Sequence, residues 1–177
     1  MDKVIKKFFF AWQLEKEKAF LEEKAKEGLL LKKVGFFRYY FEETESRDVV
    51  YQFDFQILHK KDEAEYLSVY QDWEFVSRFG SWYYFRKNND GNSIELFNNI
   101  ESKRKMFLRL LGILFIVGFP LYYQTLIMFP TIIAEEGGLS AFYNVFRPIA
   151  AILMLLHLLA SLRIFMYYIS LRNSISE

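Results

Sequence analysis

The chain contains no cysteine, only two histidines and only three prolines among its 177 residues. Without cysteine it has no disulfide, no thiol nucleophile and no thiolate site for zinc or an iron–sulfur cluster. Its 23 Lys and Arg nearly balance its 22 Asp and Glu, so no global positive field attracts DNA or RNA. The sequence also lacks a glycine-rich phosphate loop, a nucleophile elbow and an HExxH motif. We therefore expect no enzyme activity, no catalytic residue, no metal, no cofactor and no nucleic-acid partner.

Charge is unevenly distributed along the chain, and this divides it into two parts. Residues 1–105 carry most of the charge, whereas Leu110 to Ala134 contains no charged residue. About 20 apolar residues suffice to cross a bilayer core of roughly 30 Å. We predict spanning helices at about residues 107–128 and 148–171, which together form a transmembrane hairpin over residues 106–171. The short apolar run Phe8–Trp12 is too short for a secretory signal, and we expect no cleaved leader.

The positions of lysine and arginine predict the orientation of this hairpin. Basic residues crowd both of its ends (Lys103, Arg104, Lys105, Arg109, Arg163, Arg172), whereas the connecting loop has Arg147 beside Glu135 and Glu136. Because positive charge stays on the cytoplasmic side, we expect a multi-pass cell-membrane protein with both termini in the cytoplasm. The expected organisation is a cytoplasmic domain (1–93), a basic connector (94–105), the hairpin and a short cytoplasmic tail (172–177).

The second span contains two polar residues, His157 and Arg163. An ionisable residue inside a span is a functional candidate. The alternative for His157 is a hydrogen bond to the other helix, for instance to Gln124 or Tyr123. The alternative for Arg163 is an anchor whose guanidinium extends to the headgroups.

The charged part of the chain shows internal similarity. Tyr39-Tyr40-Phe41 recurs as Tyr83-Tyr84-Phe85, 44 residues later. Each half has a strand pattern, a helix pattern and two further strand patterns, with helices over 14–27 and 63–71 and strands over 4–10, 29–33, 36–42, 49–57, 73–79 and 82–87. The pattern predicts an α+β fold in which a β-α-β-β unit is duplicated. Chance similarity between two short hairpins is the alternative.

The strands over 36–42 and 82–87 are apolar on both faces. One face of each can pack beneath the helices, and the other must be covered or bind something. Aromatic and arginine side chains dominate binding hot spots, so we select Phe36, Arg38, Trp82 and Tyr84 as a partner surface. The alternative is that the two hairpins cover each other or form a homo-oligomer.

An ordered set of motifs runs through the charged part of the chain: Ala11-Trp12, Glu15-Lys16-Glu17, Phe37-Arg38-Tyr39-Tyr40-Phe41, Asp72-Trp73-Glu74-Phe75-Val76 and Trp82-Tyr83-Tyr84-Phe85-Arg86-Lys87. Over about residues 3–90 this set resembles a known bacterial family, called domain of unknown function twenty-eight-twelve. Members commonly carry a C-terminal pair of membrane helices and often occur beside PadR-type transcription regulators. The resemblance thus implies a role in a regulatory or envelope-stress unit. Asp72 departs from the family's usual glycine. The family has no agreed activity, so the resemblance implies no catalytic residues.

The function expected from these features is that of a membrane-tethered interaction or sensor module. Its expected partners are the lipid bilayer and a cytosolic regulator or another membrane protein. The alternative is an accessory subunit of a membrane transporter or channel, which acts through His157 and Arg163.

Overall fold

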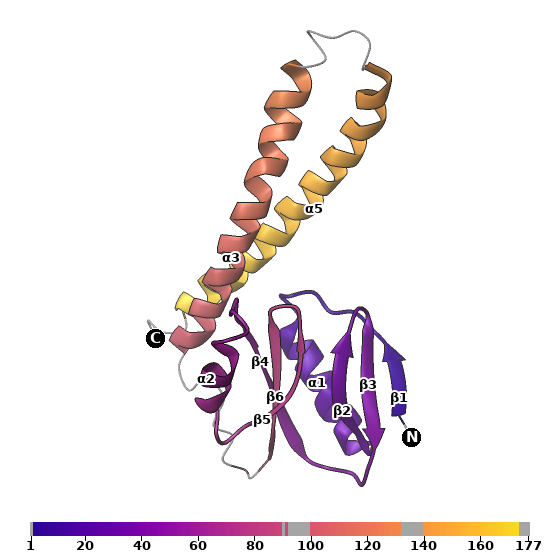
Figure 1. The fold of residues 1–177 in the computed structure, drawn as a ribbon, viewed down its shortest axis with the longest axis vertical. Helices are drawn as coiled ribbons and strands as arrows, with labels where there is room; N and C mark the ends of the chain where they lie inside the picture. The colour runs from indigo at the N-terminus through magenta and orange to yellow at the C-terminus, as the bar shows by residue number, and fades with distance from the viewer. Residues whose placement is uncertain (1, 90, 92–99, 132–139, 174–177) are drawn as a thin grey trace. The chain divides into compact units, whose positions relative to one another are not determined.

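The computed structural model describes residues 2–89, 91, 100–131 and 140–173. The chain divides into two compact units, Met1–Met106 and Phe107–Glu177, and each is described by itself. The elements of the first unit are β1 (Asp2–Lys6), α1 (Leu14–Lys26), β2 (Leu29–Gly35), β3 (Arg38–Glu43), β4 (Val49–Phe55), α2 (Glu63–Ser68), β5 (Glu74–Phe79) and β6 (Trp82–Asn88). Figure 1 shows these elements as two small sheets with two helices, which confirms the α+β prediction.

The two sheets have the same topology, so the β-α-β-β unit does occur twice. Both are antiparallel and three-stranded, in the orders β1-β3-β2 and β4-β6-β5. The third strand of each β-α-β-β repeat is the central strand of its sheet. Arg38 of β3 pairs with Lys6 and Gly35, and Trp82 of β6 pairs with Phe55 and Phe79.

An irregularity of strand pairing also repeats. The register shifts between Leu31 and Lys33 in β2, and between Phe75 and Ser77 in β5. The two shifts lie 44 residues apart, at the spacing of the repeated tyrosine motif. A β-bulge bends its strand and is a designed feature of a fold, so its recurrence supports the structural equivalence of the two hairpins.

The bulge in β2 explains where the predicted first hairpin is wrong. We expected the turn near Val34-Gly35, but β2 runs on to Gly35 and the turn consists of Phe36 and Phe37. The extra residue in β2 carries the pairing further along the strand, and Phe37 adopts a left-handed φ of 55° in the turn. The predicted first strand is also too long. After β1 ends at Lys6, the chain turns back at Phe10, whose N–H donates to Oε1 of Gln13.

Helix α1 packs against both sheets and forms the centre of the core. The Phe20 ring contacts Tyr39 and Phe41 of the first sheet, with ring centroids 5.7 and 6.2 Å apart. On the same helix, Oε1 of Glu22 accepts the N–H of Tyr51, which belongs to the second sheet. Gly28 follows the helix with a φ of +81°, and a Cβ there would lie 2.7 Å from the Thr44 carbonyl oxygen. Glycine therefore ends this helix one residue after the predicted helix range, 14–27.

Side chains of the second sheet satisfy backbone groups of β2, which lies next to β5. The N–H of Leu31 donates to the hydroxyl of Tyr51 at 3.2 Å, and the carbonyl of Leu31 accepts from Arg86 at 3.0 Å. Arg86 also binds the carboxylate of Glu74 through two nitrogens. These bonds join the two sheets through polar groups that would be costly to bury alone.

Helix α2 covers the outer face of the second sheet. The Tyr66 ring lies 5.0 Å from that of Tyr83, and the Tyr66 hydroxyl donates to Asp54 at 2.8 Å. Tyr83 and Phe85 face this helix, whereas Tyr84 belongs to the core that contains α1. Both faces of β6 are thus covered within the chain. The six-residue α2 is shorter than predicted, and Asp62 makes no side-chain capping bond.

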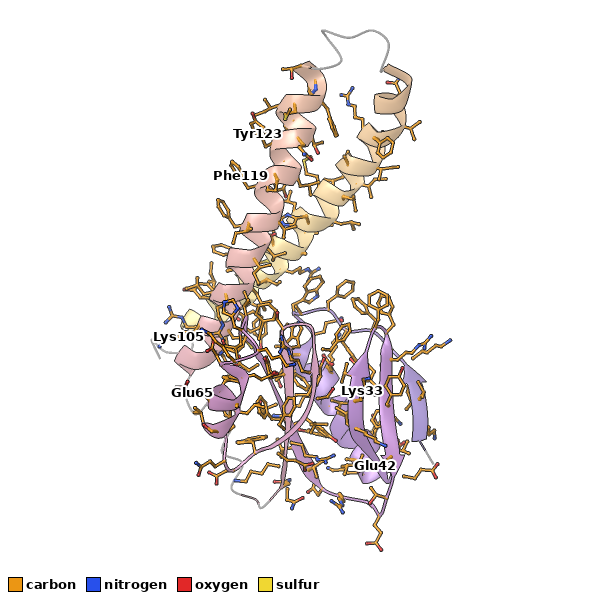
Figure 2. All side chains as sticks on the ribbon, in the orientation of Figure 1. Lys33, Glu42, Glu65, Lys105, Phe119 and Tyr123 are labelled. Atoms are coloured by element: carbon orange, nitrogen blue, oxygen red, sulfur yellow. The ribbon has the colours of Figure 1, made fainter. Side chains whose placement is uncertain are left out.

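Two long apolar helices make up the described part of the second unit, and the first of them begins in the residues that precede it. The first is α3 (Ile100–Tyr123), extended by a π-helical segment (Gln124–Met128), and the second is α5 (Ser140–Asn173). The stretches Lys103–Thr131 and Asn144–Leu171 are long and apolar enough to cross a membrane, which is compatible with the hairpin prediction. Figure 2 shows Phe119 and Tyr123 on the side of α3 that faces away from α5. Residues 94–99 of the expected connector and 174–177 of the expected tail lie outside the described residues.

Candidate functional site

A cavity of about 160 Å³ lies at one end of the first unit. It is formed by the segment between β1 and α1, the first turn of α1, the turn of the first hairpin, and the strand residues that flank the turn of the second hairpin. Most of its wall is aromatic (Phe8, Phe9, Phe10, Phe36, Phe37, Tyr39, Phe79, Trp82, Tyr84). A concave apolar site with a few converging polar groups is the usual form of a ligand site.

Three of the four residues selected from the sequence as a partner surface line this cavity. Phe36 is 70% exposed, Trp82 is half-buried, and Tyr84 is only 6% exposed. Tyr84 therefore contributes to the inner wall of the cavity and lies on no open surface. Arg38 is exposed and does not line the cavity, because its side chain stands on the other face of β3 from Tyr39.

Glu17 is a buried carboxylate in the wall of the cavity. Its side chain is 6% exposed, and its Oε1 accepts hydrogen bonds from the hydroxyls of Tyr39 at 2.6 Å and Tyr84 at 3.0 Å. Oε2 has no hydrogen-bond partner among the described residues. The helix, β3 and β6 thus meet at one carboxylate that keeps free acceptor capacity.

Burial controls the ionisation of this cluster. Desolvation raises the pKa of Glu17 above its ordinary value of 4.5, and the hydrogen bonds from Tyr39 and Tyr84 offset only part of this rise. Burial raises the pKa of both tyrosines, and the adjacent Glu17 raises it further. The two hydroxyls therefore remain protonated donors at any physiological pH.

Lys7 places a cation at the aromatic wall. Its Nζ lies 5.1 Å from the ring centroid of Phe9 and 4.1 Å from that of Phe20, both within cation–π distance. Within the described part of the chain, Lys7 and Glu17 form no ion pair. The rings therefore already accept one ammonium group, whereas the carboxylate is not neutralised by a basic side chain.

Sequence reasoning missed Glu17, although a signal was present. Its position is three residues after Leu14 and four before Leu21, which places it on the apolar face of α1. The neighbouring charges made it resemble part of a solvated helix surface.

The second copy of the repeat shows a different residue at the equivalent place. Each helix begins eight residues after the equivalent position of the preceding strand, Lys6 in β1 and Phe55 in β4. Glu17 thus corresponds to Tyr66, and Tyr39 corresponds to Tyr83. In the second copy a ring contact replaces the carboxylate–hydroxyl pair.

The two polar residues of the second span are not brought together. His157 lies against α3, with Nε2 2.9 Å from the carbonyl oxygen of Leu114 and Nδ1 3.1 Å from the hydroxyl of Tyr122. The interhelical partner is therefore Tyr122, and not Gln124 or Tyr123 as the sequence suggested. Arg163 is exposed on α5 and makes no ion pair with any described residue.

The described residues contain no group of three His, Asp or Glu side chains that could hold a metal ion. The candidate site is instead an aromatic cavity with one buried carboxylate, in a two-sheet α+β unit that is followed by two long apolar helices. A family model described as "Protein of unknown function (DUF2812)" matches residues 13–119, and the chain belongs to this family. The match includes Glu17, Tyr39 and Tyr84, and it extends along α3 to Phe119. No curated protein and no solved structure matches the chain.

Proposed function

We propose that the protein is a membrane-tethered interaction or sensor module whose working surface is the aromatic cavity. The observation that carries this proposal is the cavity itself, since a buried carboxylate beneath exposed aromatic rings is not needed to close the core. In this proposal the α3–α5 hairpin spans the cell membrane, and both termini and the first unit lie in the cytoplasm.

The rim of the cavity supports a binding role. The rim consists of Phe8, Phe10, Phe36 and Phe37, which are between 45% and 70% exposed. These rings contact one another, with centroids 4.8 Å apart for Phe8 and Phe10 and 4.9 Å apart for Phe8 and Phe37. Contiguous exposed aromatic groups are unusual on a protein that binds nothing, and they dominate interaction hot spots.

The charge pattern around the apolar helices supports the cytoplasmic placement. Basic side chains lie at the start of the first candidate span (Lys103, Arg104, Lys105) and directly after the second (Arg172), and the sequence between Thr131 and Asn144 has no Lys or Arg. The lipid bilayer is then one partner, and a cytosolic regulator or another membrane protein is the second, recruited or released according to the state of the cavity.

A site-specific photocrosslinker tests whether the partner contacts the cavity rim or another surface of the first unit. We would place p-benzoylphenylalanine at Phe36 on the rim and, as a matched control, at Val69, which is 74% exposed but does not line the cavity. Irradiation of intact membranes is expected to give a discrete adduct from position 36 alone, which Trp82→Ala abolishes. Equal adducts from both positions, or none from position 36, would exclude the cavity as the partner surface.

The orientation has its own test. A tag at either terminus is expected to resist labelling by an impermeant reagent in intact cells, and to react after permeabilisation. Labelling in intact cells would contradict the proposed topology.

No observation favours the accessory-subunit alternative. Both ring nitrogens of His157 have partners within the hairpin, which gives this residue a packing role.

A further inference from the structure

We propose that the cavity binds a small organic cation, an ammonium group that carries one aromatic or branched aliphatic substituent, with the ammonium at Oε2 of Glu17. This inference rests on the proposed function, because it names the chemical class that the sensor module would detect.

The volume of the cavity limits the size of the ligand. At about 160 Å³ it is close to the engineered cavities of roughly 150 Å³ that hold one benzene molecule. One ring or a branched alkyl group fills it, and a cationic head must then lie against the wall.

The carboxylate determines the charge of that head. Glu17 is 94% removed from solvent, and its Oε1 already accepts two hydroxyl protons. Oε2 is left to accept, and an N–H of an ammonium ion is the strongest donor that can reach a carboxylate. Since Lys7 forms no ion pair with Glu17 in the described chain, a ligand would supply the only formal positive charge at this oxygen.

The aromatic wall reinforces this preference. The indole of Trp82 is the side chain with the strongest affinity for a cation over its face, and Trp82, Tyr84 and Phe9 all line the cavity. The Nζ of Lys7 above Phe9 and Phe20 shows that rings of this region attract an ammonium group in the unliganded chain.

Ligand binding is then linked to protons. Glu17 faces the neutral hydroxyls of Tyr39 on β3 and Tyr84 on β6, and Lys7 is the basic residue among those that line the cavity. A carboxyl group whose pKa burial has raised loses its proton when a cation binds beside it. Affinity for a cation is therefore expected to increase with pH across the titration of Glu17, and affinity for a neutral ligand is not.

The test compares three probes of similar size and different charge: benzylammonium, benzyl alcohol and benzoate. Each is titrated by calorimetry into the full chain in phosphatidylcholine nanodiscs, with empty nanodiscs as the blank. Benzylammonium is expected to bind best, and more tightly as pH rises above 4.5, since a primary ammonium keeps its charge far above the carboxyl range.

The matched variants are Glu17→Gln and Glu23→Gln, which remove one charge each from the same helix, Glu23 being exposed and outside the cavity. Glu17→Gln is expected to weaken benzylammonium binding by about tenfold or more, through the loss of one charge-assisted hydrogen bond, and Glu23→Gln is expected to leave it unchanged. Benzyl alcohol should bind Glu23→Gln like the wild type and should lose less affinity in Glu17→Gln than benzylammonium does. If circular dichroism shows that Glu17→Gln does not fold, the proposal is tested by comparing the three probes on the wild type and on Glu17→Asp, which keeps the carboxylate.

Several results would overturn the proposal. They are equal affinity of the wild type for benzylammonium and benzyl alcohol, tightest binding of benzoate, the absence of benzylammonium binding at millimolar concentration, and equal losses in Glu17→Gln and Glu23→Gln. These outcomes are separate from the crosslinking result. A specific adduct at Phe36 without a preference for cations would support the interaction module and exclude the cationic ligand. Cation binding without an adduct would support the cationic ligand and exclude the cavity as a partner surface.

Discussion

Gly118 on α3 offers a sharp test of the helix packing, because its hydrogen is replaced by a methyl group in Gly118→Ala. A Cβ at this position would lie 2.5 Å from Cε1 of His157, 3.0 Å from Nε2 and 3.2 Å from Nδ1. A contact under 3.0 Å requires a shift, and all three of the near atoms belong to the imidazole, so the ring is expected to move. Movement breaks its bonds to the Leu114 carbonyl at 2.9 Å and to the Tyr122 hydroxyl at 3.1 Å.

The expected loss follows from these two bonds. Hydrogen bonds between membrane helices contribute about 0.6 to 2 kcal/mol each, so loss of both in Gly118→Ala should destabilise the α3–α5 pairing by about 1 to 4 kcal/mol. The matched control is Gly112→Ala on the same helix, where a Cβ would meet no atom within 4 Å. The control should be neutral or slightly stabilising, because alanine favours helix more than glycine does.

The measurement is unfolding of the full chain in mixed micelles of rising dodecyl sulfate content, followed by energy transfer between dyes on α3 and α5. The same unfolding measurement is made on His157→Ala and on the double variant, which gives a double-mutant cycle. If the imidazole causes the loss, Gly118→Ala should cost little once His157 is gone. Equal stabilities of the two alanine variants, or additive losses in the cycle, would refute the packing argument.

Two further predictions concern the first unit. Between pH 4.5 and the raised pKa of Glu17, the folded chain holds a proton that the unfolded chain releases, so the stability of the unliganded chain falls as pH rises and this fall disappears in Glu17→Gln. Urea titrations at several pH values check this, and parallel pH profiles of the two proteins would contradict it. Arg86→Met leaves the Leu31 carbonyl without its buried donor and should cost about 1 to 3 kcal/mol, whereas Glu74→Gln should cost less than about 1 kcal/mol, since the Glu74 side chain is 60% exposed. Comparable losses in denaturant unfolding would show that the ion pair, and not the carbonyl contact, matters.

Local patterns in the sequence predicted much of the fold. The recurring tyrosine motif identified the two hairpins, and Gly28 marked the end of α1 because both signals depend on neighbouring residues. The turn at Phe36-Phe37 depends on a bulge near Lys32, and no residue type marks that bulge. A bulge of this kind is determined by how two strands pair in the folded chain, and not by the local sequence.

The candidate site was only partly predictable for a related reason. Phe36 and Trp82 stood out as aromatic residues on strands that are apolar on both faces. Glu17 is tolerated inside the protein only because Tyr39 and Tyr84, 22 and 67 residues further along, bring their hydroxyls to it. Helical periodicity can place a carboxylate on an apolar face, but the donors that satisfy it come from distant parts of the chain.

The presence of Tyr66 at the position equivalent to Glu17 has a consequence for binding stoichiometry. Tyr66 places a phenol ring against Tyr83 there, so the two halves share a backbone plan and differ in chemistry at this position. The cavity beside Glu17 takes its wall from both halves, with Tyr39 from the first and Trp82 and Tyr84 from the second. The proposed ligand is therefore expected to saturate at one equivalent per chain.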